Sequence, residues 1–490
     1  MKNWLLGLML ATGLAQAEPM ILTGTLTHAD HNTYREVPFE VPAGTEAIYV
    51  KVSHDGQDDN TVIDLGMYDP FGFRGWSGGN KTEFYISQFD ATPSYRPGPI
   101  LHGTWHLILG LPNVSIGVET DFRAEITLIN SENRGNSTEF HTPISTERGW
   151  YRGDFHAHTG HSDGSCTSLA GNKVPCPVHK TLDAALEAGL DFVSVTDHNT
   201  LTHQATLREL APYYDTIAVI AGREVTTFNG HANVFSANQP TDFQLGSNRL
   251  PTLSHLYQQV EDQNALISIN HPGRPTGAEC MGCGWNPPGN DYSRVDAIEI
   301  VNTPQYLLHE TFDHPLSGIP FWEQKLEQGY RIIGIGGSDN HEPDVDYGDP
   351  KYRFAPVTVV KADSLSQADI LDAVRVGRIY LDLALEPGRL IDIEARNGNQ
   401  SGFMGDTLTA NQGDRIELTF ITEQAEGLSL ELITSSGLTI EHGELQVNQS
   451  ESQHQMSYTS DGERSWVRAN LRDSDGRLVM VSNPVFINFD

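Results

Sequence analysis

The sequence predicts a multidomain protein of α/β plus all-β class, in which a central α/β barrel is flanked by an N-terminal and a C-terminal β-sandwich. Three observations support this fold class. The chain has 490 residues, which is enough for several buried cores. Its middle region alternates strand-like runs with amphipathic helical stretches, as parallel α/β folds do. Both flanking regions contain short strand-like runs separated by Gly, Pro, Asn and Asp.

The first 17 residues are expected to be a secretory signal peptide. Lys2 gives a positive start, an apolar run extends from Trp4 to Leu14, and Ala15 and Ala17 fit a cleavage site. The run is too short for a transmembrane helix, and no later segment reaches that length. We therefore expect export to the periplasm or to the medium, with no membrane span.

Residues 18–148 are expected to form the first sandwich. Its strand candidates are "AIYVKVSH", "TVIDLGMY", "EFYISQF", "GTWHLILG" and "RAEITLI", and no helical period lasts ten residues. Trp76 and Trp105 would suit a sugar-binding surface. A sandwich core requires aromatic side chains in any case, so we expect both to pack inside.

Residues 149–385 are expected to form the barrel. The strand candidates are "DFHAHT", "LDFVSVTDH", "IAVIAGREVT", "ALISINHP", "DAIEIVN", "RIIGIGGSD" and "APVTVVKA". The helix candidates are "KTLDAALEAG", "ATLRELAPYY", "LSHLYQQVEDQ", "FWEQKLEQG" and "SQADILDAVRVG". This alternation predicts parallel strands joined by right-handed crossovers. Seven or eight such units favour a barrel over an open sheet.

Residues 386–490 are expected to form a second, smaller β-sandwich. The strand candidates are "IDIEARNG", "RIELTFIT", "LSLELITS", "SWVRANLRD" and "VFINF". The region shows no repeat of fixed period.

The four cysteines are Cys166, Cys176, Cys280 and Cys283. In an exported chain they are expected to be oxidised, and three pairings are possible. The simplest joins Cys166 to Cys176 and Cys280 to Cys283, because each pair then closes one loop. The alternative is a four-thiolate zinc site, but Cys166 and Cys176 are spaced too widely for a common zinc knuckle.

The charge balance limits the possible partners. The net charge is −33, from 31 Lys and Arg against 64 Asp and Glu. Such a field repels polyanions at long range, so binding of duplex nucleic acid is not expected. A small anionic substrate remains possible where local cations outweigh the global field.

Imidazoles and carboxylates are concentrated in "GDFHAHTGHSDGS" and recur at later strand ends. His156 and His158 are two residues apart on a predicted strand, so both side chains lie on one face. The other members lie at or just beyond the carboxyl ends of candidate strands, where barrel active sites are found. The nine candidate metal ligands are His156, His158, Asp163, His198, Glu224, His231, His271, Asp339 and His341.

A pocket of this composition requires divalent cations. Unpaired carboxylates at close range repel one another and raise each other's pKa, whereas cations suit mixed nitrogen and oxygen ligands. Taken alone, each histidine is more often a structural residue than a ligand. The whole set, with its spacing, predicts a multinuclear metal site.

The segments "WYRGDFHAHTGHSDG", "TDHN", "GREVTTFNGHAN", "NHPG" and "GGSDNH", in this order, resemble the motifs of the PHP (polymerase and histidinol phosphatase) superfamily. They are most similar to exported metallohydrolases of the carbaryl-hydrolase type. The resemblance covers about residues 148–385, and "SWVRANLRDSDGRLVMVSNPVFI" is similar to the tail of such exported members. The resemblance implies a distorted TIM-like barrel of the (β/α)7 type with two or three metal ions.

The resemblance also implies which residues hold each ion. One group would be His156, His158, Glu224 and Asp339, and Glu224 would bridge to a second group with His231 and His271. A third group would be Asp163, His198 and His341. Some family members have His where this chain has Asp163, and both residue types are viable ligands. Zinc, manganese, iron and cobalt all suit such ligands, so the sequence leaves the metal open.

Three more residues are candidates for catalysis or substrate contact. Asp197 is expected to orient a ligand, and the alternative is a strand-end cap. Arg274, in "HPGRP", is expected at the rim of the pocket, and the alternative is an exposed loop arginine. His161 is a weaker candidate. Arg223 should point to the opposite face of its strand.

The expected activity is that of an exported phosphoesterase, in which a metal-bound hydroxide attacks a phosphodiester or a small phosphoester. The scarcity of local cations argues against a polyphosphate. The alternative is a metal-dependent carbamate or carboxylic ester hydrolase, and a second alternative is a non-enzymatic surface- or polymer-binding protein. No serine lies in a nucleophile elbow, so a catalytic triad is not expected. The oligomeric state stays open.

Overall fold

A computed structural model describes residues 18–79, 81–130, 143–237, 239–277, 280–346, 348–436, 438 and 445–489. The chain forms two compact units, Met1–Glu139 and Phe140–Asp490, and each is described by itself. The expected signal peptide, residues 1–17, lies outside the described residues, and the expected boundaries at residues 148 and 385 stay predictions. Within the described ranges, no helix combines the length and the apolar character needed to cross a membrane.

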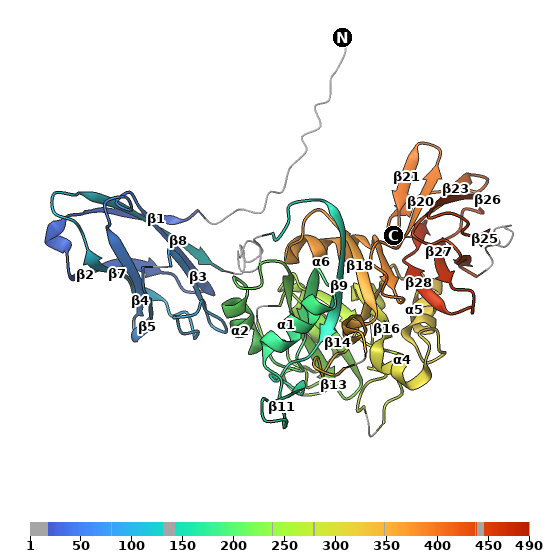
Figure 1. The fold of residues 1–490 in the computed structure, drawn as a ribbon, viewed down its shortest axis with the longest axis horizontal. Coiled ribbons are helices and arrows are strands. Elements are labelled where there is room, and N and C mark those ends of the chain that lie inside the picture. The colour runs from blue at the N-terminus through green and yellow to red at the C-terminus, as the bar shows by residue number, and fades with distance from the viewer. Residues whose placement is uncertain are drawn as a thin grey trace, which may run out of the picture. The chain divides into compact units, whose positions relative to one another are not determined.

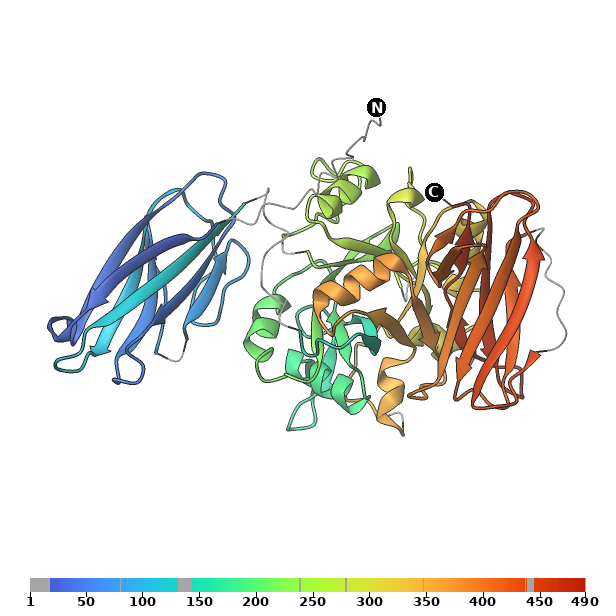
Figure 2. The ribbon, with the colours of Figure 1, turned by 90° about the horizontal axis from the view of Figure 1, so that it is seen from above.

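The first unit consists of two four-stranded antiparallel sheets (Figures 1 and 2). One sheet has the order β1 (Met20–Leu26), β8 (Thr120–Ile129), β3 (Ala47–His54) and β6 (Glu83–Ser87). The other has the order β2 (Thr33–Val41), β7 (Gly103–Asn113), β4 (Val62–Asp69) and β5 (Gly72–Ser77). Side chains from both sheets contribute to one apolar core, as expected for a sandwich.

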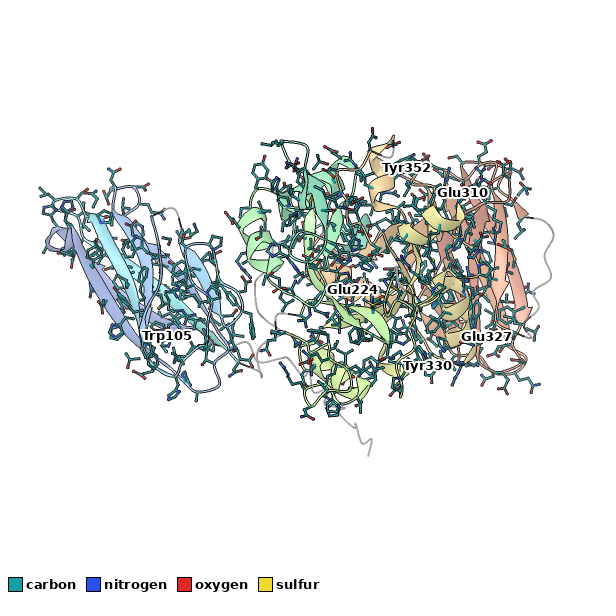
Figure 3. The ribbon with its side chains drawn as sticks, turned by 90° about the horizontal axis from the view of Figure 1, so that it is seen from below. Trp105, Glu224, Glu310, Glu327, Tyr330 and Tyr352 are labelled. Atoms are coloured by element: carbon teal, nitrogen blue, oxygen red, sulfur yellow. A yellow bond between two sulfur atoms is a disulfide. The ribbon has the colours of Figure 1, made fainter. Side chains whose placement is uncertain are left out.

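Trp105 lies in this core and is marked in Figure 3. Its side chain is fully buried, and its indole N–H donates to the carbonyl of Leu101 at 2.7 Å. Trp76 is half-buried and packs edge-on against Tyr34. The expectation that Trp105 serves the core is therefore confirmed, and its ring is not accessible to a sugar.

The second unit is built around one long sheet. Its first strands follow the order β17-β16-β15-β14-β13-β12-β9-β18-β19. These strands are β9 (Gly149–Ala157), β12 (Phe192–Val195), β13 (Ala218–Thr227), β14 (Gly230–Phe235), β15 (Leu266–Ile269), β16 (Ala297–Asn302), β17 (Ile333–Gly337), β18 (Val357–Ala362) and β19 (Ile379–Asp382). A small hairpin, β10 (Ser165–Thr167) and β11 (Lys173–Pro175), follows β9 along the chain.

Two of these strands depart from the expected parallel pairing. β9, β12 and β13 pair in parallel, as do β15, β16 and β17. β14 is antiparallel to both β13 and β15, because Phe228 and Asn229 form a two-residue turn that folds β13 and β14 into a hairpin. β18 is antiparallel to β9 and to β19.

The carboxyl ends of β9 and β17 lie side by side, although they stand at different places in the sheet order. Ala157 and Asn340 form a parallel bridge, and Ser338 donates its backbone N–H to Asp154 Oδ1 at 2.7 Å. The sheet is therefore curved enough to bring the segments that follow these two strands together. Those segments contain four of the nine candidate ligands, namely His158, Asp163, Asp339 and His341.

Six helices accompany the described strands of this unit. They are α1 (Val178–Glu187), α2 (His203–Leu210), α3 (Leu253–Glu261), α4 (Thr303–His309), α5 (Gly318–Glu327) and α6 (Gln367–Val376), with 3-10 turns at Tyr292–Arg294 and Pro350–Phe354 and, in the first unit, at His28–Asp30. α6 shows why these stretches are helical. Ser366 caps its first turn by accepting from the Asp369 N–H at 3.1 Å, and Gly377 ends it in the left-handed conformation, at φ 91°.

The last hundred residues are mostly β-structure. One four-stranded sheet has the order β21 (Gln400–Phe403), β20 (Leu390–Asn397), β23 (Arg415–Glu423) and β26 (Glu451–Thr459). The remaining strands are β22 (Thr407–Leu408), β24 (Ser429–Thr434), β25 (Leu445–Gln446), β27 (Ser465–Arg472), β28 (Leu478–Ser482) and β29 (Val485–Ile487). They join the long sheet, because β28 pairs with β19.

Polar contacts also tie this C-terminal β-structure to the strands before it. Asn483 Oδ1 accepts from the Gly334 N–H at 2.7 Å, and its Nδ2 donates to the Gly334 carbonyl at 2.8 Å. The buried guanidinium of Arg468 donates to Glu323 of α5 and lies over the ring of Trp322. Both β17 and α5 are therefore supported from the C-terminal side.

The predicted disulfide pairing is confirmed. Cys166 is bonded to Cys176, and Cys280 is bonded to Cys283. No cysteine is free, which excludes the four-thiolate zinc site.

Candidate metal centre

His156 and His158 come from the end of β9 and the residue that follows it, and both are fully buried. Their Nε2 atoms face the same carboxylates. His156 Nε2 lies 3.3 Å and His158 Nε2 lies 3.2 Å from Asp339 Oδ1. The same two nitrogens lie 3.4 and 3.5 Å from Glu224 Oε2. Two imidazoles and two carboxylates therefore enclose one point, as the sequence predicts.

Glu224, labelled in Figure 3, lies within β13. Its other oxygen faces a different pair of imidazoles. Its Oε1 lies 3.2 Å from His231 Nδ1 and 3.5 Å from His271 Nε2. His231 belongs to β14 of the hairpin, rather than to a loop, and His271 follows β15. This fully buried carboxylate therefore lies between two sets of imidazoles.

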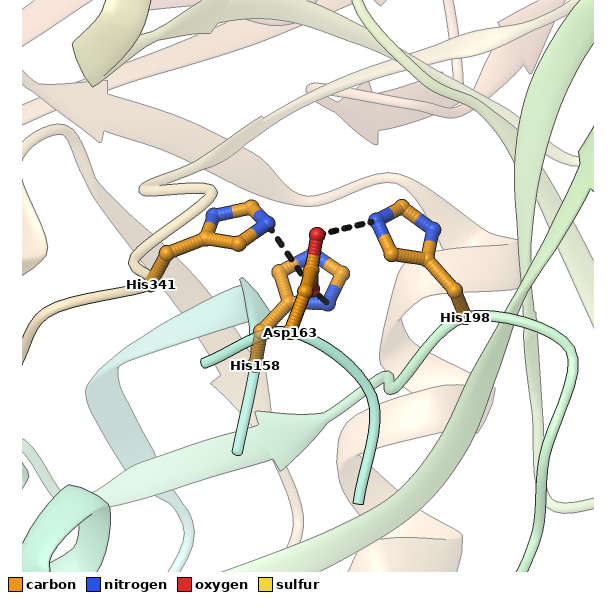
Figure 4. Close-up of side chains that lie close together, drawn as sticks. All are labelled: His158, Asp163, His198 and His341. Carbon is orange, nitrogen blue, oxygen red and sulfur yellow. Dashed lines mark ion pairs between the residues drawn. The ribbon is translucent and has the colours of Figure 1, made fainter. Parts of the chain in front are cut away.

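A third group of side chains lies at the open side of the cluster (Figure 4). Asp163 Oδ1 lies 3.3 Å from His341 Nε2, and Asp163 Oδ2 lies 3.6 Å from His198 Nε2. His158 reaches this group with its other nitrogen, because its Nδ1 lies 4.0 Å from Asp163 Oδ1. Asp163 is the most exposed of the four, with 58% of its side chain accessible. All nine predicted ligands are thus brought together in three overlapping groups.

Two ligand positions have an unusual backbone. Asp339 has φ 53° and His271 has φ 30°, in the left-handed region that non-glycine residues seldom adopt. Such conformations cost about 1–3 kcal/mol and persist where the surrounding structure requires them. Here they turn the side chains inward just after β17 and β15.

The arrangement leaves buried polar atoms without partners. His156 Nε2, His158 Nε2 and Glu224 Oε2 form no hydrogen bond of ordinary geometry to any described residue, although His198 Nδ1 lies 2.8 Å from Glu224 Oε2. An unsatisfied buried polar group costs about 1–3 kcal/mol. Three such atoms aimed at one point are satisfied together by a cation, so the residues present fit a metal ion.

Charge within the cluster supports the same conclusion. Burial alone would raise the pKa of Glu224, but the neighbouring imidazoles of His156 and His198 lower it well below its usual range. Burial would also raise the pKa of Asp339, yet His156, His158 and His341 lower it well below its usual range. Burial and the adjacent His341 and His198 lower the pKa of His158 to about 4. Ionised carboxylates and a neutral imidazole are the forms that bind metal.

Two residues that the sequence analysis did not single out orient the ligands. Glu299 Oε2 lies 2.6 Å from His156 Nδ1, and Asn270 Nδ2 donates to Glu224 Oε1 at 2.9 Å. Glu299 is an acidic residue inside the apolar strand β16, which is a signal that could have identified it. Asn270 immediately precedes His271. Its position just after β15 is the only sequence signal for its role.

Asp197 does not face the ligand atoms, but it holds the loop that carries Asp163. It accepts from the Thr159 N–H and hydroxyl, each at 2.7 Å, and from the Ser162 hydroxyl at 2.7 Å. Its other neighbour is the buried imidazole of His203, at 3.1 Å. Asp197 therefore fixes the backbone between two metal-binding segments.

The remaining candidates lie at different distances from the cluster. Arg274 Nη1 lies 3.9 Å from Asp339 Oδ2, and its side chain is 20% exposed, so it is at the pocket rim as expected. His161 is exposed and its Nδ1 lies 2.8 Å from Thr202 Oγ1, away from the ligand atoms. Arg223 is buried and has no contact with the cluster among the described ion pairs, in agreement with its expected orientation.

A pocket of about 390 Å³ opens onto the ligands. Arg274 is the one lysine or arginine among its described lining residues, and Met281 and Pro304 give it an apolar wall. The lining residues are Asp163, His198, Glu224, Thr226, His231, His271, Arg274, Cys280, Met281, Pro304, Asp339 and His341. The pocket therefore combines candidate ligand atoms, one guanidinium and an apolar wall.

No protein family model and no curated protein matches this chain. Among solved structures, a Bifidobacterium adolescentis protein for which metal-dependent phosphoesterase activity has been proposed is similar over 45% of this chain and 94% of its own, with 12% identity and a TM-score of 0.29. A β-glucuronidase of glycoside hydrolase family 2 is similar over 94% of this chain and 61% of its own, with 9% identity and a TM-score of 0.16. At TM-scores this low, neither similarity establishes a shared fold.

Proposed function

We propose that this protein is an exported metal-dependent phosphoesterase that hydrolyses phosphodiesters or small phosphoesters. The observation that carries the proposal is the bridging position of Glu224. Its Oε1 faces His231 and His271, whereas its Oε2 faces His156, His158 and, at 2.8 Å, His198 Nδ1. A buried set of this kind suits two or three divalent ions better than a hydrogen-bonded core.

Each ion has its own residues in this proposal. His156, His158, Glu224 and Asp339 would hold one ion, and Glu224, His231 and His271 a second. Asp163, His198 and His341 would hold a third. The imidazole and carboxylate ligands accept zinc, manganese or iron. When bound, the ions supply Lewis acidity, which activates water and polarises the ester oxygen.

The chain's own residues would bind and orient the substrate. Arg274 contributes a planar guanidinium at the rim, close enough to Asp339 to reach a phosphoryl oxygen beside the ligands. A single guanidinium matches the single negative charge of a phosphodiester better than it matches the several negative charges of a polyphosphate. The apolar wall of Met281 and Pro304 would contact the organic part of the substrate and exclude water.

We also propose membership of the PHP superfamily, near the carbaryl-hydrolase type, with a barrel formed by β9 and β12 to β17. The proposal is supported by the motif order, by the seven strands and by the bridge between the segments after β9 and β17. Export is supported by the two disulfides, since these persist in oxidising compartments.

A carbamate or carboxylic ester hydrolase is the second candidate function, and the apolar wall of the pocket favours it. A substrate panel separates the two. The metal-replete protein is expected to hydrolyse bis(p-nitrophenyl) phosphate faster than p-nitrophenyl phosphate and faster than a naphthyl carbamate. The His156→Ala variant provides the background rate. Phosphoester rates equal to that background, with carbamate turnover well above it, would replace the leading proposal by the second.

A further inference from the structure

The loop closed by the Cys280–Cys283 disulfide lies against the two imidazoles that share Glu224 Oε1. His231 Nε2 lies 3.1 Å from the Met281 carbonyl oxygen, and His271 Nδ1 lies 3.3 Å from the Cys283 carbonyl oxygen. Two backbone carbonyls from one four-residue loop therefore contact two histidines that are 40 residues apart, one on β14 and one just after β15.

These contacts determine which nitrogen of each ring carries the proton. A carbonyl oxygen only accepts, so the nitrogen that faces it must be the donor. In the neutral rings, His231 then carries its proton at Nε2 and His271 at Nδ1. The nitrogens left with a lone pair are His231 Nδ1 and His271 Nε2, and both face Glu224 Oε1.

Two lone pairs that face a carboxylate oxygen at 3.2 and 3.5 Å repel it unless a cation lies between them. The loop thus presents both imidazoles in the form that a metal ion requires. Histidine ligands commonly donate their second ring N–H to a carbonyl or carboxylate, which fixes the ring and its tautomer.

The position of the loop depends on close packing. Cys283 is fully buried, and Gly282 lies against the turn of the β13–β14 hairpin. Gly282 has φ 78°, and a Cβ atom there would lie 2.2 Å from the Thr227 carbonyl oxygen. Only a glycine allows the loop to approach the hairpin this closely.

We propose that the disulfide-closed loop Cys280–Cys283 positions His231 and His271 for the second metal ion, so that the affinity of this one ion depends on the disulfide. The inference rests on the proposed metal-dependent function and adds a regulatory consequence to it. A dithiol that reduces the S–S bond to two thiols, and is itself oxidised to a disulfide, would release the loop. The carbonyls would then no longer hold the two rings.

The test is titration of the metal-free full chain with Zn²⁺, read by calorimetry and by elemental analysis after dialysis. In the Cys280→Ser/Cys283→Ser variant, one Zn²⁺ per chain is expected to bind about 10- to 100-fold more weakly, the usual effect of losing a partner of a metal-bound histidine. The His231→Ala variant shows what the titration looks like when that ion is lost. Combining His231→Ala with the two cysteine substitutions should weaken Zn²⁺ binding little further. Gly282→Ala keeps both cysteines and should show the same defect.

Gly277→Ala is the matched control, because Gly277 has ordinary backbone and no atom within 4 Å of its would-be Cβ. Its Zn²⁺ titration should equal that of the wild type. Thermal unfolding of each variant shows whether it is folded. Unchanged Zn²⁺ binding by both the double variant and Gly282→Ala would overturn this inference and leave the proposed function intact. A wild-type chain that binds no Zn²⁺ would overturn both.

Discussion

Glu299 Oε2 lies 2.6 Å from His156 Nδ1, and both side chains are buried inside the second unit. The carboxylate accepts the Nδ1 proton, so that in the neutral ring the lone pair of His156 is at Nε2, which faces Glu224 and Asp339. Asn302 holds Glu299 in turn, donating from Nδ2 to Oε1 at 3.0 Å. The first metal group is therefore oriented by a chain of buried polar contacts that begins on β16.

Glu299→Gln tests this orientation at constant size. Gln can present an amide N–H to the imidazole, which removes the acceptor and favours the wrong tautomer. We expect metal affinity to fall about 10- to 100-fold, with phosphodiester turnover falling in parallel. Elemental analysis and the rate with bis(p-nitrophenyl) phosphate measure the two effects. Glu209→Gln, on the exposed side of α2, is the charge-matched control and should resemble the wild type. A fully loaded Glu299→Gln enzyme would refute the assigned role.

Glu224→Gln and Asp163→Asn should differ in how many ions they lose. Glu224 lies within 3.5 Å of histidines in all three groups, whereas Asp163 contacts the third group and, at 4.0 Å, His158. We expect Glu224→Gln to retain at most one ion per chain and to lose activity. Asp163→Asn should lose a single ion. Equal stoichiometry in the two variants, measured at the same free Zn²⁺, would contradict the bridging arrangement.

Arg274→Ala should weaken the binding of phosphodiesters without changing the metal content. Loss of a charged hydrogen bond of about 1.5–3 kcal/mol corresponds to a KM about 10- to 100-fold higher. Carbamate turnover should be unaffected, since a neutral carbonyl substrate does not require the guanidinium. Arg249→Ala, at an exposed arginine outside the pocket lining, is the control. An unchanged KM for bis(p-nitrophenyl) phosphate would exclude Arg274 from the substrate site.

Ser162→Ala should loosen the loop that carries Asp163, because Ser162 donates to Asp197 Oδ1. We expect weaker binding of the third ion, about tenfold, with the other two retained. His161→Ala removes a neighbouring side chain that contacts Thr202 instead, so it should bind all the ions normally. Identical titrations of Ser162→Ala and the wild type would show that the Asp197 network does not support the third group.

Metal uptake should release protons, and affinity should rise with pH. Burial alone would lower the pKa of His341, but Asp163 and Asp339 raise it to about 9 in the metal-free chain. Burial likewise opposes the charges of Glu299, Asp339 and Glu224 at His156, yet these raise its pKa well above its usual value. Both rings are then protonated at pH 7, and a metal ion must displace those protons. The enthalpy of Zn²⁺ binding should therefore vary with the ionisation enthalpy of the buffer. Affinity that is constant between pH 6 and 9 would disprove the coupling.

Much of the site could be predicted because its residues lie at strand ends that sequence patterns reveal. The period-two spacing of His156 and His158 places both on one side of β9, and Asp339 and His341 follow β17 in the same way. The topology was harder to predict, because the turn at Phe228 and Asn229 makes β14 antiparallel where strand–helix alternation implies parallel strands. A two-residue turn reverses the chain locally, so it determines the direction of β14 regardless of the strand–helix alternation in the surrounding sequence.

The contacts that the supporting residues make could not be predicted from the sequence in the same way. Glu299 reads as one acidic residue in an apolar strand, and nothing in the sequence relates it to His156, which is 143 residues away. The contacts of the Met281 and Cys283 carbonyls cannot be predicted from side-chain patterns, because every residue has a backbone carbonyl. Contacts of this kind depend on how the curved sheet brings distant segments together, which is information that periodicity does not contain.

The two hydrogen bonds between Asn483 and Gly334 have a consequence for truncation experiments and for evolution of the chain. Gly334 belongs to the strand that ends just before Asp339, so the tail of the chain is part of the scaffold of the reaction site. The expected boundary near residue 385 marks a change from strand–helix alternation to short strands. Truncating the chain there would remove contacts that support β17. If the proposed function holds, recombination that replaced the tail with an unrelated module would disrupt the candidate metal centre, and mutations in the tail would be subject to selection for activity.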